Sequence, residues 1–146
     1  MIDIKQQAER CSEAQLKMDF EGLLPYVPKK LLEMMGGREV LKTKLAQGNA
    51  VLKSRGVTID SAVIGNPELP QKYEGVYVAL VPMTTNLTTP QGKVIATSSM
   101  VAISEDNAAS WSFVDTSTVN EEKLGVLYPA LKGKVKFPPA TAKVVK

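Results

Sequence analysis

The stretch of sequence that decides the fold runs from Tyr73 to Ser104 and reads YEGVYVALVPMTTNLTTPQGKVIATSSMVAIS. It contains two long β-rich segments, 73–87 and 93–104, on either side of Thr89-Pro90-Gln91-Gly92. Proline and glycine favour a tight turn, and a short connection between two strands makes them antiparallel. The sequence therefore predicts a long β-hairpin that turns at Thr89 to Gly92.

Two shorter segments extend this hairpin into a sheet. Residues 57–64 are β-rich and end at the turn signal Gly65-Asn66-Pro67, and residues 110–116 follow a turn at Asp106-Asn107. Segments of this length between such residues are typical of strands. Because sequential strands with short connections usually pair, we expect a four-stranded antiparallel meander.

The first 56 residues have a helical period instead. In the first helical segment, apolar side chains recur at three-, four- and seven-residue steps, at Ile4, Ala8, Cys11 and Met18. A short second helix is predicted from Pro28 to Met35, where Gly36-Gly37 ends it. A third helix stops at Gly56 and presents on one face Leu41, Leu45 and Leu52. The sequence thus predicts an α+β domain in which three N-terminal helices precede four strands.

A short helix and a tail are predicted after the last strand. Thr118 and Glu121 have the spacing of a capping box, which predicts a helix through Leu131 that Pro129 keeps short. Residues 1–136 then form a single domain, and residues 137–146 form an extended basic tail.

Charge and hydropathy exclude two classes of partner. Five lysines and no acidic residue follow position 131, whereas residues 1–131 carry 13 basic and 15 acidic residues. The positive charge therefore belongs to the tail, and no nucleic-acid surface is predicted on the body. The N-terminus resembles no signal peptide, and no apolar run is long enough for a membrane helix. We expect a cytoplasmic protein without a membrane partner, or a periplasmic or secreted one if a leader was removed.

The residue types that are missing exclude several kinds of site. The sequence has no histidine and a single cysteine, Cys11, so it lacks the usual ligand sets for zinc, iron and copper and cannot form an intramolecular disulfide. No metal site and no cofactor are predicted, although an oxygen-only magnesium or calcium site stays open. With no histidine to activate its thiol, Cys11 is interpreted as a buried apolar residue.

Several segments resemble one family. They read LEMMGGRE (32–39), IGNP (64–67), VP (81–82), VAISED (101–106) and WSFVD (111–115). Together they resemble an uncharacterised bacterial branch of the nuclear transport factor 2-like, or cystatin-like, superfamily, over residues 7–136. The resemblance implies a strongly bent sheet that wraps a long helix and leaves a pocket at one end of a cone. Members of the branch frequently carry a histidine after the tyrosine of the short helix, but here Val27-Pro28 follows Tyr26.

The resemblance also implies candidate site residues. Enzymes of the superfamily, such as ketosteroid isomerase, use pocket aspartate, tyrosine or histidine residues as acids and bases. Asp115 shares one face of its strand with Trp111 and Phe113, which makes it a candidate general base. The alternative is that Asp115 ends the strand, where it is solvated or bonds backbone amides. Tyr26 and Tyr77 are the candidate pocket tyrosines.

Two classes of function follow. We favour a non-catalytic binding module for a small apolar ligand or a protein partner, because histidine is missing and no polar pair converges. The ligand would lie in the mouth of the cone near Trp111, Phe113 and Tyr77, with Asp115 and Tyr26 as polar contacts; alternatively, the same residues fill the cone. The second class is an acid–base enzyme of isomerase, dehydratase or cyclase type that uses Asp115 and a pocket tyrosine.

A homodimer is predicted from the middle of the sheet. Apolar residues occupy both faces there, with Val76, Val78 and Leu80 on one and Tyr77, Ala79 and Val81 on the other. We expect the helices to cover only one of these faces, and a large uncovered apolar patch is unusual on a monomer. The other face would then meet a symmetric copy.

Overall fold

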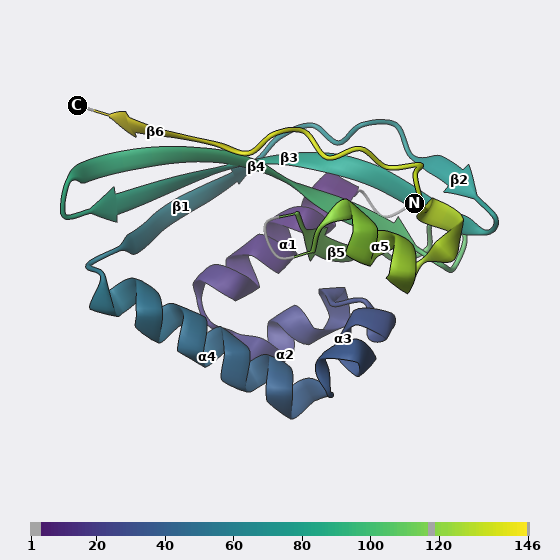
Figure 1. Ribbon diagram of the computed structural model, residues 1–146, viewed down its shortest axis with the longest axis horizontal. Coiled ribbons are helices and arrows are strands. Elements are labelled where there is room, and N and C mark those ends of the chain that lie inside the picture. The colour runs from purple at the N-terminus through teal and green to yellow at the C-terminus, as the bar shows by residue number, and fades with distance from the viewer. Residues whose placement is uncertain (1–3, 117–118, 146) are drawn as a thin grey trace.

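The computed structural model describes residues 4–116 and 119–145 of the 146-residue chain. It shows an α+β protein in which a strongly curled antiparallel sheet arches over a group of helices (Figure 1). Within the described residues, every pair of neighbouring strands is antiparallel. The predicted fold class is therefore confirmed, although the numbers of helices and strands differ from the prediction.

The N-terminal part contains four α-helices rather than three. They are α1 (Ile4–Leu16), α2 (Phe20–Leu23), α3 (Lys29–Met35) and α4 (Arg38–Ser54), with a 3-10 turn at Leu24–Tyr26 between α2 and α3. Met18, which was predicted to continue the first helix, instead adopts a left-handed conformation with φ 56° in the turn after α1. Asp19 then begins α2, because its side chain accepts a hydrogen bond from the Gly22 amide at 3.0 Å. The additional helix results from this local cap.

The predicted hairpin forms the centre of the sheet. It consists of β3 (Val76–Thr89) and β4 (Gly92–Ser104), which pair from Tyr77↔Ser104 to Thr89↔Gly92. The hydroxyl of Thr89 donates to the Gly92 carbonyl at 2.8 Å and accepts from the Gln91 amide at 3.2 Å. The predicted turn is therefore confirmed, and residues 73–104 contain no helix.

The sheet contains four further strands. They are β1 (Thr58–Ile64), β2 (Gln71–Tyr73), β5 (Ser112–Asp115) and β6 (Thr141–Val145), and the order is β1-β3-β4-β5 with β2 on β3 and β6 on β4. Tyr73 was predicted to begin the long hairpin, but it belongs to β2. The chain turns between Tyr73 and Val76, because Glu74 and Gly75 both have positive φ, at 50° and 87°.

The C-terminal segment differs from the prediction in two ways. The predicted extended tail, residues 137–146, contains a strand that sequence reasoning did not assign, since β6 pairs with β4 from Lys93↔Val145 to Thr97↔Thr141. The last helix, α5 (Glu121–Leu127), is capped by Asn120, whose side chain accepts from the Lys123 amide at 2.8 Å. Thr118, the predicted cap, lies outside the described residues. A 3-10 turn, η2 (Pro129–Leu131), follows α5, as Pro129 suggested.

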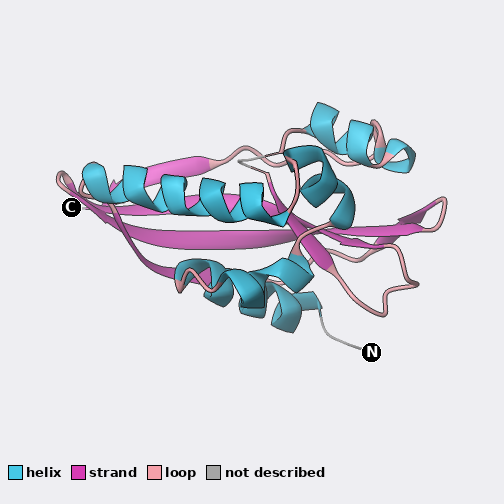
Figure 2. Ribbon diagram, turned by 90° about the horizontal axis from the view of Figure 1, so that it is seen from below, coloured by secondary structure: helices cyan, strands magenta, loops and turns pink. Residues whose placement is uncertain are grey.

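Both faces of the middle strands are covered within one chain (Figure 2). On the α1 face, Ala79, Val81 and Ala102 pack with Ala8 and Cys11 of α1. On the α5 face, a second core joins strand residues to α5, η2 and the segment that follows, with Val78, Val101, Ile103 and Val114 against Leu124, Leu127, Tyr128, Leu131 and Val135. The expectation that helices cover only one face is therefore wrong, because α5 and η2 fold back onto the other. The homodimer stays a prediction, without this argument in its favour.

Candidate functional site

Four of the five predicted site residues pack against one core on the α1 face. Trp111 and Phe113 belong to it and are 4% and 6% exposed, and Tyr26 and Tyr77 are partly buried against it. The Tyr26 and Phe113 rings lie 6.2 Å apart between centroids and are tilted by 49°. This packing matches the alternative in which the aromatic residues fill the interior. None of the three hollows described below is lined by Trp111, Phe113 or Tyr77.

Asp115 lies at the end of β5, opposite Met100, and is half-buried. Its charge acts on Cys11, a buried residue of α1. Burial, with a smaller contribution from Asp115, raises the pKa of the Cys11 thiol to about 12. At neutral pH the thiol is therefore protonated and a poor nucleophile, in agreement with the interpretation of Cys11 as a buried apolar residue.

Gln7 ties α1 to the beginning of this aromatic cluster. Its side-chain oxygen accepts a hydrogen bond from the Trp111 amide at 3.2 Å, and the residue is 5% exposed. Its side-chain nitrogen has no hydrogen-bond partner among the described residues. The contact joins the first helix to the residue just before β5, so Gln7 helps to hold α1 against this core.

A hollow of about 400 Å³ lies elsewhere, between the C-terminal end of α1, α4 and the start of β1. We call it the α4 hollow. Six of its lining residues are apolar, namely Leu16, Met18, Leu45, Leu52, Val57 and Ile59. The others are Gln15, Lys44, Gly48, Asn49, Lys53 and Thr58, so no acidic residue lines it.

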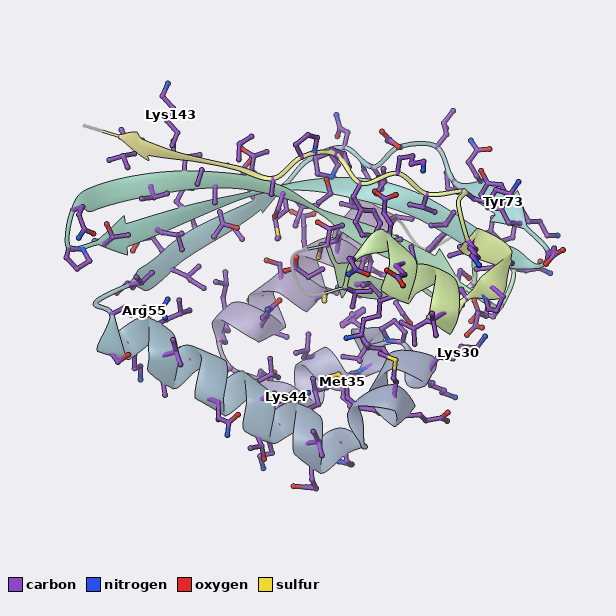
Figure 3. All side chains as sticks on the ribbon, viewed as in Figure 1. Lys30, Met35, Lys44, Arg55, Tyr73 and Lys143 are labelled. Atoms are coloured by element: carbon purple, nitrogen blue, oxygen red, sulfur yellow. The ribbon has the colours of Figure 1, made fainter. Side chains whose placement is uncertain are left out.

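The α4 hollow lies beside a helix that is buried at few positions. Among the 17 residues of α4, Leu41 is the buried one, and Leu45 and Leu52 are half-buried. At roughly 100° per residue, Leu45 and Leu52 lie within about 20° of each other, at the middle of the wall that α4 contributes. Lys44 and Lys53 lie about 90° to either side of that middle. The wall is therefore apolar along its centre and carries a lysine at each margin (Figure 3 labels Lys44).

Gly48 adds no side chain to this wall. A β-carbon added at Gly48 would meet no atom within 4 Å, so the space beside it is open. A glycine inside a helix costs about 0.5–1 kcal/mol relative to alanine. At this position a larger side chain would therefore fit the backbone and occupy the α4 hollow.

The other hollows differ in chemistry. One of about 410 Å³ lies between β3, the segment before it and residues 134–138, and charges of both signs, Glu68, Lys134 and Lys136, line it. Tyr26 lines one of about 240 Å³ among Arg10, Glu13, Lys17 and Asp19, which again mix the two signs. The α4 hollow combines an apolar wall with charges of a single sign.

Sequence reasoning identified Leu45 and Leu52 as a helix face but did not recognise the hollow that they border. One signal was present, because residues 38–55 carry five basic residues and one acidic residue. The described residues contain no group of three or more metal-ligating side chains that could hold an ion. In the same described ranges, no helix is long and apolar enough to cross a membrane.

Comparison with protein-family models and with curated proteins gives no match for this chain. The resemblance to the nuclear transport factor 2-like superfamily therefore stays a prediction, which rests on the five segments quoted above. The curled sheet is loosely compatible with the cone of that superfamily.

Proposed function

We propose that the protein is a non-catalytic binding module and that it takes a small apolar ligand in the α4 hollow. The observation that carries this proposal is a concave space of about 400 Å³ with six apolar side chains in its wall. Ligand pockets are commonly about 300–1,000 Å³ in volume and mostly apolar, with a few polar groups that fix orientation. The ligand position differs from the one expected from the sequence, since Trp111 and Phe113 lie in the packed interior.

The exposure of the wall supports this assignment. Leu16, Met18 and Ile59 are 38%, 43% and 38% exposed, so apolar surface is available for burial. Each methylene of a ligand that becomes buried contributes about 0.8 kcal/mol, whereas association costs about 4 kcal/mol or more. A ligand with a chain of about ten carbons would then gain about 4 kcal/mol net and bind in about the millimolar range.

The chemistry of the wall favours binding over catalysis. It offers amide, hydroxyl and ammonium groups but no carboxylate, phenol or thiol. Acid–base catalysis needs a group that can accept and return a proton near neutral pH. The residues of the acid–base alternative, Asp115 and Tyr26, line other parts of the molecule.

Gly48 allows a direct test. We expect N-phenyl-1-naphthylamine, a neutral apolar fluorescent probe, to bind the native protein and the Gly48→Ala variant. Gly48→Leu should weaken binding at least tenfold, because the larger side chain occupies the hollow. Circular dichroism and melting temperature would show that both variants are folded. Gly48→Ala should be about 0.5–1 kcal/mol more stable than the native protein.

The Asp115→Asn variant tests both where the probe binds and whether the acid–base alternative holds. Because Asp115 lies outside the α4 hollow, the variant should bind the probe with native affinity. Unchanged probe binding by Gly48→Leu would contradict the proposed function. If the native protein turns over a ligand, and Asp115→Asn keeps the affinity but loses the turnover, the acid–base enzyme is supported instead.

A further inference from the structure

The charges around the α4 hollow restrict what its ligand can be. Lys44 and Lys53 line it together with six apolar residues and no aspartate or glutamate. Neither lysine forms an ion pair within the described ranges 4–116 and 119–145. Elsewhere, Lys17, Lys30 and Arg38 each pair with a glutamate, at 2.6, 3.5 and 2.6 Å. The lysines of the hollow thus keep their charge available to a ligand.

The position of the two lysines suits an amphiphile. Because they lie at opposite margins of the α4 wall, their aliphatic stems can cover apolar surface while the ammonium groups stay in water. A chain that lies along Leu45 and Leu52 would then have a cation at either edge of the wall. A negatively charged head would meet a lysine without leaving the solvent.

The charge is local to α4 and does not reflect a basic body. Residues 38–55 carry five basic residues and one acidic residue, whereas residues 56–131 carry three basic and eight acidic residues. Lys53 lies in the last turn of α4, where the helix dipole by itself favours a cation. Lys44 lies in the middle of the helix, where that explanation does not apply. The position of Lys44 therefore says more about the charge of the ligand than the position of Lys53 does.

We propose that the ligand is a free single-chain amphiphile with an anionic head, a carboxylate or a phosphate, whose chain fills the α4 hollow and whose head is held at the rim by one of the two lysines, Lys44 or Lys53. This inference rests on the proposed function. It adds the sign of the ligand's charge and the residues that recognise it.

The test compares three single-chain compounds whose chains have about ten carbons and whose heads differ in charge. We expect the full chain to bind decanoate more tightly than 1-decanol, and 1-decanol more tightly than decyltrimethylammonium, by displacement of N-phenyl-1-naphthylamine. At least one of Lys44→Gln and Lys53→Gln should weaken decanoate binding about two- to fivefold, which is the range of solvent-exposed ion pairs. Both should leave 1-decanol binding unchanged. Lys123→Gln, on α5 and outside the hollow, is the matched control and should bind all three like the native protein.

The chain length and the salt concentration give independent readouts. Affinity for the carboxylates should rise about fourfold per added methylene until the hollow is full, because each methylene adds about 0.8 kcal/mol. Added salt should reduce the preference for decanoate over 1-decanol, since it screens exposed charges. The lysine variant that weakens decanoate binding should already lack part of that salt dependence.

The outcomes separate this inference from the function on which it rests. If 1-decanol binds as tightly as decanoate and the lysine variants bind both normally, the anionic head is refuted while the hollow remains a binding site. If no compound binds and Gly48→Leu has no effect, the proposed function fails as well. Co-sedimentation with phosphatidylglycerol vesicles that excess decanoate does not compete would replace the free amphiphile by a lipid surface. A dimer that Gly48→Leu dissociates would show that a second copy occupies the hollow.

Discussion

Cys11 shows how one buried group couples stability to pH. Its ordinary pKa of 9.0 rises to about 12 in the folded protein, first because of burial and second because of Asp115. A group whose folded pKa is raised stabilises the fold below its unfolded pKa, and that contribution is lost as the pH rises toward the folded value. The contribution is therefore complete below about pH 9 and declines toward pH 12.

We expect the native protein to lose stability between pH 9 and pH 11 more steeply than the Cys11→Ala variant does. The other titrating groups are common to both proteins, so the difference isolates the thiol. Urea denaturation at the two pH values measures it. Equal losses for both proteins would contradict the assigned environment, as would rapid reaction of native Cys11 with a thiol reagent at pH 8.

The C-terminal strand β6 belongs to the sheet without contributing a buried residue to either core. All five of its residues are exposed, and Val144 and Val145 retain 51% and 42% of their accessible surface. Phe137 packs against the core on the α5 face, and its amide donates to the Glu121 side chain at 3.1 Å. The chain after Phe137 reaches β4 through Pro138-Pro139, and β6 contributes main-chain pairing with little apolar burial.

Deletion of residues 141–146 should therefore leave the protein folded. We expect an unfolding free energy lower by no more than about 1–2 kcal/mol, because few net hydrogen bonds and little apolar burial are lost. Hydrogen exchange should show lost protection at those amides of residues 93–97 that bond to β6, and native protection at residues 100–103, which β5 pairs. Loss of protection at both segments would mean that β6 supports the core.

Across the whole molecule, helices on both sides of the curled sheet form two packed cores, whereas one side of α4 borders an open hollow. The parts of β3 and β4 that carry the core residues lie between two cores, whereas α4 borders a hollow beside the start of β1 (Figures 1 and 2). Leucines in these two environments should respond differently to truncation. Leu124 in the α5 core is 1% exposed, and Leu52 is half-buried at the hollow.

Leu124→Ala should lower the free energy of unfolding by about 2–5 kcal/mol, because it leaves a closed cavity. Leu52→Ala changes the same number of atoms but should cost about 1 kcal/mol or less, since its space is already open to water. Thermal or urea denaturation of the pair measures this contrast. Equal costs would show that the α4 wall is packed as tightly as the core and that the hollow is not open in solution.

Local interactions explain what sequence reasoning predicted correctly. Pro90-Gln91-Gly92 determines the hairpin turn within a few residues, and alternation along residues 76–104 is enough to indicate two long strands. Local geometry also explains two errors. Met18 and Glu74 adopt positive φ in turns that interrupt a helical stripe and a strand, and neither residue type signals that conformation.

The sequence by itself determined the α+β class, the antiparallel hairpin, the absence of histidine chemistry and the inert character of Cys11, because these depend on residue type and short-range periodicity. Only the tertiary structure decided that α5 covers the second face, that residues 141–145 join β4 and that Trp111 and Phe113 are interior. It also decided that Leu45 and Leu52 border a hollow. Periodicity shows which side chains share a face, but the surface that meets that face comes from chain segments far away in the sequence.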